Sequence, residues 1–189
     1  LESAVFVDKD RVLFGRAALD EADAQAGAKR AALRSFKTLL SVSDLERALN
    51  TNAPATIDPH RIFQMRDLIV LYLAYLLASI DRAIQADPIL AQGGAFSRRY
   101  AAPAWRSGDS AGMHNVIVRL FGEAEAFRAV VGKRLLSPDG ISLRSISDAL
   151  PKAAEQAQPL DMGLIYEATA AAAYTSVGLE GAGSHIIVV

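Results

Sequence analysis

Residues 69–80 read IVLYLAYLLASI, the longest apolar run in this chain of 189 residues. Charged side chains close the run, with Asp67 before it and Asp81 and Arg82 directly after it. A run of this length is too short to cross a bilayer as a helix, and a helix that is apolar on nearly all faces is buried between other elements. The stretch therefore predicts no membrane span, but a buried helix over 68–83 within a longer helical segment over 60–86.

Short segments rich in β-branched and aromatic residues predict strands on both sides of this helix. SAVFV and RVLFG, residues 3–7 and 11–15, are joined by the turn sequence DKD and predict two strands. FSRRYAAPAW, residues 96–105, predicts an edge strand because Pro103 has no N–H to donate to a ladder. HIIVV, residues 185–189, predicts a buried strand next to it. Strands mixed with helices predict an α/β or α+β fold in which helices cover a sheet.

Other segments have the residue pattern of helices. Residues 17–40 predict a helix with a break near Gly27. Ser43, with Glu46 three positions later, predicts a capping box at the start of the next helix. Residues 114–136 predict a further helix with apolar side chains available to a core.

Composition and charge narrow the class of protein. Hydrophobic residues make up 51% of the chain and charged residues 22%, which is ordinary for a soluble globular domain. The formal net charge is −1, so we expect no nucleic-acid partner, because such partners usually require a basic stripe. The chain has no cysteine. Disulfides and thiolate metal sites are therefore excluded, in keeping with a cytoplasmic location.

Common catalytic motifs do not account for this chain. The histidines, His60, His114 and His185, lack the spacing of zinc ligands, and no Gly-x-Ser-x-Gly motif of serine hydrolases is present. VVGKR, residues 130–134, lacks both the first glycine and the final Ser or Thr of a phosphate loop. GAG, residues 181–183, lacks the third glycine of a dinucleotide fingerprint.

Lys37 and Glu167 are the two side chains of most chemical interest. Lys37 lies in RSFKTLL, and a lysine held near a phosphate supplies a compact positive charge for phosphoryl transfer. Glu167 lies at the head of an alanine-rich run in GLIYEATAAAAYTSVGL, residues 163–179, which predicts a closely packed helix. Residue chemistry alone leaves an ordinary alternative for each: an exposed helix lysine, and a first-turn glutamate favoured by the helix dipole.

Five segments follow one family pattern, and they occur in the same order along the chain as in the family. IYEATAAAAYTSVGL, residues 165–179, is similar to N-E-P-T-A-A-A-x-A-Y-G-L and is the most specific match. Residues 34–40 are similar to a lysine segment x-x-K-R-L-I, and residues 98–105 to a strand that carries V-P-A-Y. Residues 3–18 are similar to two strands that end in a G-x-A-A turn, and residues 185–189 to a strand before a phosphate hairpin. The chain thus resembles the ATPase domain of the seventy-kilodalton heat-shock (DnaK-like) chaperones, in the actin-like ATPase superfamily.

The resemblance implies an α/β fold of the actin-like, ribonuclease H-like type, with a mixed sheet and packed helices. The chain would be a fragment of the first lobe of a nucleotide-binding domain. Residues 1–95 would form mainly the subdomain at the tip of the lobe, and residues 96–189 mainly the core strands and helices. The adenosine-binding lobe and two phosphate loops would belong to a longer parent, so this piece alone is expected to be inactive.

The resemblance also assigns three site residues. Lys37 is implied to be a catalytic residue that helps to position the attacking water, and Glu167 a catalytic residue that holds the metal through water. Pro103 is implied to couple the nucleotide state to the other lobe. The implied cofactors are ATP and Mg²⁺, and the implied partners of the parent are nucleotide and a client protein or co-chaperone. We also expect Lys37 and Glu167 to face one cleft.

The chain departs from the family pattern in three places. Tyr166 stands where the family has asparagine, and Ala168 where it has proline after the glutamate. SGDSAGMHN, residues 107–115, does not match the segment that follows the proline-bearing strand. Two other functions therefore stay open: an actin-fold protein that binds partners or assembles without hydrolysis, and a small-molecule kinase of the same superfamily.

Overall fold

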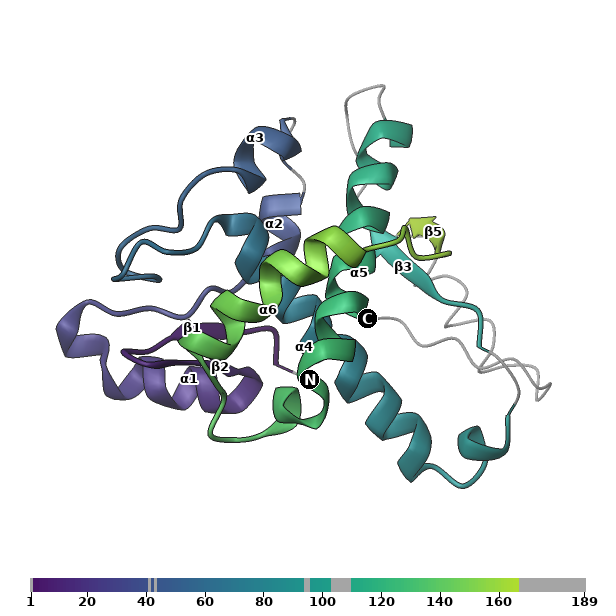
Figure 1. The fold of residues 1–189 in the computed structure, drawn as a ribbon, viewed down its shortest axis with the longest axis horizontal. Helices are drawn as coiled ribbons and strands as arrows, with labels where there is room; N and C mark the ends of the chain where they lie inside the picture. Colours follow the sequence, from purple (N-terminus) through teal and green to yellow (C-terminus); the bar gives the residue numbers. More distant parts are fainter. Residues whose placement is uncertain (1, 41, 43, 94–95, 103–109, 167–189) are drawn as a thin grey trace.

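The computed structural model describes residues 2–40, 42, 44–93, 96–102 and 110–166 (Figure 1). These residues contain six α-helices, a three-stranded antiparallel sheet and a two-stranded parallel sheet. The mixed α/β class predicted from the sequence is therefore confirmed. The actin-like superfamily, and the division into two subdomains at residue 95, stay predictions.

The first sheet has the order β1-β2-β4. β1 (Val5–Val7) and β2 (Arg11–Phe14) form the antiparallel hairpin that the sequence predicts, with Val5 opposite Phe14. The third strand, β4 (Ile141–Ser142), comes from the far end of the described chain and pairs antiparallel with β2. The third strand of this sheet thus comes from a segment far from the hairpin in sequence, and the hairpin residues alone do not predict this partner.

Alternate residues of the hairpin face two different layers, because successive side chains of a strand point to opposite faces. Phe6 and Leu13 pack with Ala18 and Ala22 of α1 (Gly15–Ala24), which covers one face of the sheet. The residues between them join the main core on the other face; these are Val5, Val7, Val12 and Phe14. The hairpin therefore lies between α1 and the rest of the molecule.

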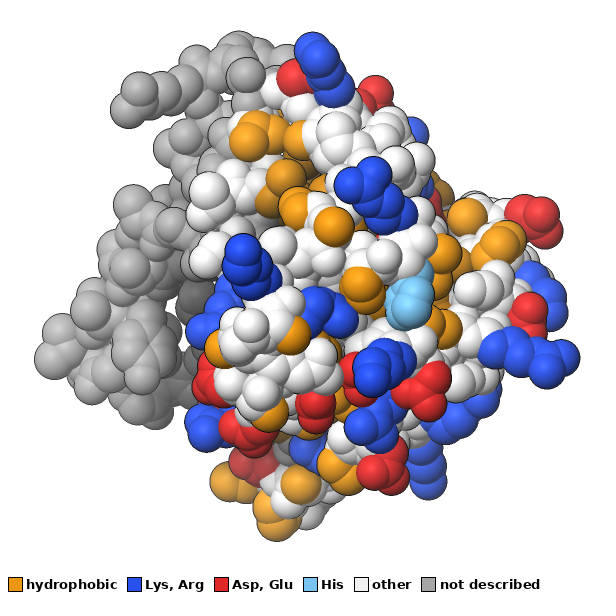
Figure 2. Space-filling view, turned by 90° about the vertical axis from the view of Figure 1, so that its left-hand side faces the viewer, with side chains coloured by type: hydrophobic (Ala, Val, Ile, Leu, Met, Phe, Trp, Pro, Cys, Tyr) orange, Lys and Arg blue, Asp and Glu red, His pale blue; other side chains and the backbone are white. Residues whose placement is uncertain are grey.

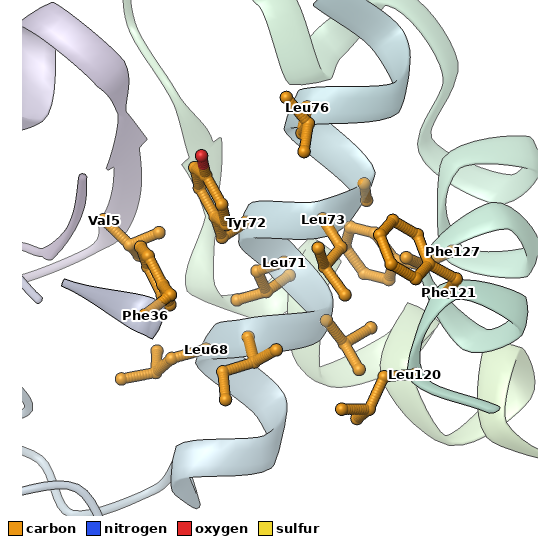
Figure 3. Packing of buried hydrophobic residues seen from close by; sticks show 14 of the residues in the cluster. Val5, Phe36, Leu68, Leu71, Tyr72, Leu73, Leu76, Leu120, Phe121 and Phe127 are labelled. Carbon is orange, nitrogen blue, oxygen red and sulfur yellow. The ribbon is translucent and has the colours of Figure 1, made fainter. Parts of the chain in front are cut away.

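Helix α4 (Met65–Ala86) forms the centre of the main core. Every residue from Leu68 to Ala74 is buried, and so are Leu76 and Leu77. Figure 3 shows why: Tyr72 points toward Phe36 on one side of the helix, whereas Phe121 and Phe127 lie on the other side. The predicted buried helix over 68–83 is confirmed over most of its length.

The start of α4 differs from the prediction, because the helix begins at Met65 and not at His60. Asp58 is fully buried, and its carboxylate accepts hydrogen bonds from the backbone N–H groups of His60 (3.0 Å), Ile62 (2.7 Å) and Phe63 (2.8 Å). These bonds hold residues 58–63 in a loop. The helix starts directly after this loop with a capping box between Gln64 and Asp67.

Two more helices complete the main core. α5 (Ser110–Val131), extended by the 3₁₀ helix η3 (Gly132–Leu136), packs against α4 and against α6 (Leu143–Gln156). The predicted helix over 114–136 is confirmed, although its last turn is 3₁₀. The side chain of Ser142 caps α6 by accepting a hydrogen bond from the N–H of Ser145.

The segment over 17–40 is only partly helical. α1 ends at Ala24, the 3₁₀ helix η1 (Ala26–Ala28) follows, and the short α2 (Phe36–Leu40) comes later. The predicted break near Gly27 is correct, but it is longer than expected. The reason is tertiary: Leu33 exchanges two backbone hydrogen bonds with Val5 (3.1 and 2.8 Å), which extends the first sheet.

Helix α3 (Leu45–Leu49) is capped by Asp44, whose carboxylate accepts a hydrogen bond from the N–H of Arg47 (3.1 Å). Ser43, predicted as the capping residue, lies outside the described residues. Aspartate and serine are equally good caps at a helix start. The helix start is therefore correct to within one residue, but the cap is Asp44 and not the predicted Ser43.

The second sheet corrects one prediction. Residues 163–166 form a strand, β5 (Gly163–Tyr166), and not the first turn of a helix. β5 pairs in parallel with β3 (Arg99–Ala102), and the register places Tyr100 opposite Leu164. β3 confirms the middle of the strand predicted over 96–105, which begins three residues later than predicted. The helix predicted beyond residue 166, and the strand HIIVV predicted beside β3, lie outside the described residues.

The surface carries charges of both signs. Figure 2 shows basic and acidic side chains intermingled on the described part of one face, with apolar side chains between them. Ion pairs such as Arg119–Glu46 (2.7 Å) and Arg16–Asp20 (2.8 Å) join some of these groups. None of the helices within the described ranges is long and apolar enough to span a membrane.

Candidate functional site

The three predicted site residues are described to different extents. Lys37 lies in α2, where the structure describes the backbone but not the side chain. Pro103 and Glu167 lie outside the described residues. The roles of all three, and a cleft shared by Lys37 and Glu167, therefore stay predictions. The structure does describe the elements that lead to these residues.

Pro103 and Glu167 each follow directly in sequence from a strand of the parallel pair. β3 ends at Ala102 and β5 at Tyr166, and these two residues are partners in the register. In open α/β sheets, ligands bind outside the carboxyl ends of parallel strands. The pairing is not predicted from the sequence, where GLIY forms the start of an expected helix. The β-branched Ile165 between Leu164 and Tyr166 was the available signal for a strand.

An aromatic cluster holds β3 in place. Tyr100 is buried, and its hydroxyl is hydrogen-bonded to Nδ1 of His114 on α5 (2.7 Å). The Tyr100 and His114 rings are stacked, with 5.8 Å between their centroids, and Phe121 lies 6.1 Å from Tyr100. In the sequence His114 is an isolated histidine. The structure gives it a partner from another element.

The segment before β5 rests on the same helix. Gly122 of α5 lies so close to Gln158 that a Cβ at this position would be 2.1 Å from the Gln158 carbonyl oxygen. The N–H of Leu160 lies 3.5 Å from the carbonyl of Val118 on α5. At the start of β5, the N–H of Gly163 donates to the carbonyl of Arg98 (2.9 Å). Helix α5 thus contacts β3 through Tyr100 and the segment before β5 through Gln158 and Leu160 (Figure 1).

Helix α2, which carries Lys37, is anchored on another side of α4. Phe36 is buried, and its ring stacks on Tyr72 with 4.2 Å between the centroids and an angle of 7°. In Figure 3, Phe36 and Phe121 lie on opposite sides of α4. The stacked pair therefore fixes the backbone position of Lys37 relative to α4, whereas α5 fixes that of β3 and β5.

A separate hollow of about 330 Å³ lies between the start of α4, α5 and α6. Its lining includes Ile62, Arg66, Asp67, Glu123, Leu150 and Pro151. Arg66 binds the buried Glu123 through two N–H groups, one of them Nε at 3.1 Å from Oε2. Burial raises the pKa of the Asp67 carboxyl, while the N–H of Gln64 and the charge of Arg66 act in the opposite direction. The Arg66–Glu123 ion pair links α4 to α5. None of the site residues predicted from the sequence, Lys37, Pro103 and Glu167, is among the residues that line this hollow.

Within the described part of the chain, no three or more His, Asp and Glu side chains gather as a metal site. Comparison with protein-family models, with curated proteins and with solved structures finds no match. The candidate site is therefore defined by the parallel strand pair and by the two residues that follow it in sequence.

Proposed function

We propose that the chain is part of a chaperone-like ATP-binding domain, whose parent protein couples ATP binding or hydrolysis to the binding of a partner or client. The observation that carries the proposal is the register of β3 and β5. Two parallel strands end side by side, and the next residues in the chain are Pro103 and Glu167. These are two of the three positions to which the resemblance assigns a role.

The proposed chemistry is phosphoryl transfer to water. It needs a positive charge near the phosphates and an anion that holds the hydrated Mg²⁺, because catalysis in this class is mostly positioning and electrostatic stabilisation. In this proposal Lys37 supplies the cation and Glu167 the anion. Pro103, after the end of the strand next to β5, would link the occupancy of the site to the other lobe.

A second candidate is a protein of the same superfamily that binds nucleotide or partners without turnover. The observation that favours it is Tyr166, the last residue of β5, which stands where the resembled family has asparagine. The residue before the glutamate thus differs in size and chemistry. ATP binding without hydrolysis would favour this candidate.

The test uses the full-length protein that contains this chain. We expect Mg-ATP binding in calorimetry, and steady-state hydrolysis that falls roughly 10²-fold or more in Lys37→Ala and in Glu167→Gln, as for the loss of one preorganised group elsewhere. Matched controls are Lys133→Ala and Glu155→Gln, since both of these side chains are exposed on other elements. Full-length protein that does not bind Mg-ATP would contradict the proposal, and unchanged turnover in both site variants would contradict the site.

The chain by itself is expected to bind Mg-ATP only weakly. Under the proposal, much of the phosphate cradle belongs to the rest of the parent, and phosphoryl transfer depends on that cradle. A dissociation constant in the low micromolar range for residues 1–189, about −8 kcal/mol, would show that those parts are not needed.

A further inference from the structure

The hydrogen bond between Tyr100 and His114 is a polar contact between the parallel strand pair and α5. It joins the Tyr100 hydroxyl to Nδ1 of His114 at 2.7 Å, and the two rings are stacked at an angle of 12°. Tyr100 is 8% exposed as a residue, and its hydrogen bond to His114 is partly buried. A buried hydroxyl without a partner is costly, and the bond therefore favours one position of β3 along α5.

Among the described residues the second sheet has two strands, and two strands alone do not form an independently stable sheet. The packing of Tyr100 against His114 and Phe121 of α5 is one source of support for this pair. His114 and Phe121 both contact the ring of Tyr100, and they lie two turns apart on one face of this helix. Gly122 allows the segment before β5 to approach the same helix closely. A shift of β3 along α5 would therefore also change its alignment with β5.

We propose that Tyr100 and His114 are a positioning pair, which sets where the carboxyl ends of β3 and β5 lie relative to α5. The inference rests on the proposed function, because it gives the pair a role in ATP hydrolysis.

The test compares three changes in the full-length protein. Tyr100→Phe keeps the stacked ring and removes only the hydroxyl. His114→Leu removes the acceptor, whereas His114→Asn keeps an amide that is able to accept a hydrogen bond. Tyr75→Phe is the matched control, because Tyr75 stacks on Phe14 of the other sheet, with 5.3 Å between the ring centroids.

Loss of one hydrogen bond corresponds to about a fivefold change in rate when it affects only the transition state. We expect kcat for ATP hydrolysis to fall about fivefold in Tyr100→Phe and in His114→Leu, with the Kd of Mg-ATP within about twofold of wild type. The double variant Tyr100→Phe/His114→Leu should be no slower than either single variant, because both remove the same bond. His114→Asn should recover part of the rate, and Tyr75→Phe should match wild type.

Hydrogen exchange supplies a readout that does not depend on ATP. Amides of residues 99–102 and 163–166 should exchange faster in Tyr100→Phe than in Tyr75→Phe. If wild type neither binds nor hydrolyses ATP, the proposed function fails and the positioning role fails with it. If wild type hydrolyses ATP and Tyr100→Phe has the same kcat, or if the two single effects add, only the positioning role is overturned.

Discussion

Replacing the buried Asp58 by alanine should destabilise the protein strongly. The Asp58 carboxylate is fully buried and accepts three backbone hydrogen bonds within five residues of itself. These bonds form the loop that ends where α4 begins. Arg61 in this loop has a φ of 52°, a left-handed conformation that costs free energy in a residue with a side chain. The carboxylate offsets this cost.

The size of the effect follows from the exposure of the three donors. His60 and Ile62 are exposed, so water can replace the hydrogen bonds that their N–H groups lose. Each of these two losses is therefore expected to cost about 0.5–1 kcal/mol of stability. Phe63 is buried, and an unsatisfied buried donor costs about 1–3 kcal/mol. The sum predicts that Asp58→Ala lowers the free energy of unfolding by about 3 kcal/mol.

Urea denaturation of the chain measures this change. With a slope of about 2 kcal/mol/M, a loss of about 3 kcal/mol moves the midpoint down by roughly 1.5 M. The matched control is Asp87→Ala. Asp87 also accepts two backbone N–H bonds, from Ile89 and Leu90, but Ile89 is exposed and Leu90 is only partly buried, so about 1 kcal/mol is expected. Equal midpoints for the two variants would refute the argument that burial of the Phe63 donor sets the cost.

Three more predictions test the packing around α4 and α5. Gly122→Ala should destabilise the protein by about 1–3 kcal/mol, because the new Cβ would collide with the Gln158 carbonyl. Gly27→Ala is the control and should not destabilise it, because no atom lies within 4 Å of the new Cβ; thermal denaturation compares the two variants. Arg66→Met should lower the free energy of unfolding by about 3 kcal/mol, because it leaves Glu123 buried and unpaired. Adding Glu123→Leu should restore most of this stability in a double-mutant cycle, and strictly additive effects would contradict the prediction. Burial raises the pKa of Asp67 above its ordinary value of 3.8, so its contribution to stability is greatest at low pH and is lost as pH rises through the folded-state pKa. The stability of wild type relative to Asp67→Asn should therefore fall between about pH 3 and neutral pH in urea titrations, and a constant difference would show that burial does not control this carboxyl.

The outcome for the candidate site illustrates the limit of local patterns. Lys37, Pro103 and Glu167 come from motif resemblance, and the structure describes none of these side chains. The strand signal of Ile165 in residues 163–166 is weak beside the alanine-rich run that follows, which has strong helix propensity. Which strand these four residues pair with, β3, is a long-range contact that no local pattern specifies.

Local sequence is sufficient for the elements whose signal lies within one segment. The apolar run over 69–80 specifies a buried helix, because charged residues are missing from all of its faces. The β1–β2 hairpin follows from β-branched and aromatic residues around a short turn. In both cases the residues that carry the pattern are neighbours in the chain, so the pattern is readable without knowledge of the fold.

The features that join distant segments depend instead on the tertiary arrangement. Leu33 is extended because it pairs with Val5. Tyr100 meets His114 only because β3 lies along α5. Backbone pairing and the desolvation of polar groups set these outcomes, and each depends on a partner whose position no local sequence pattern specifies.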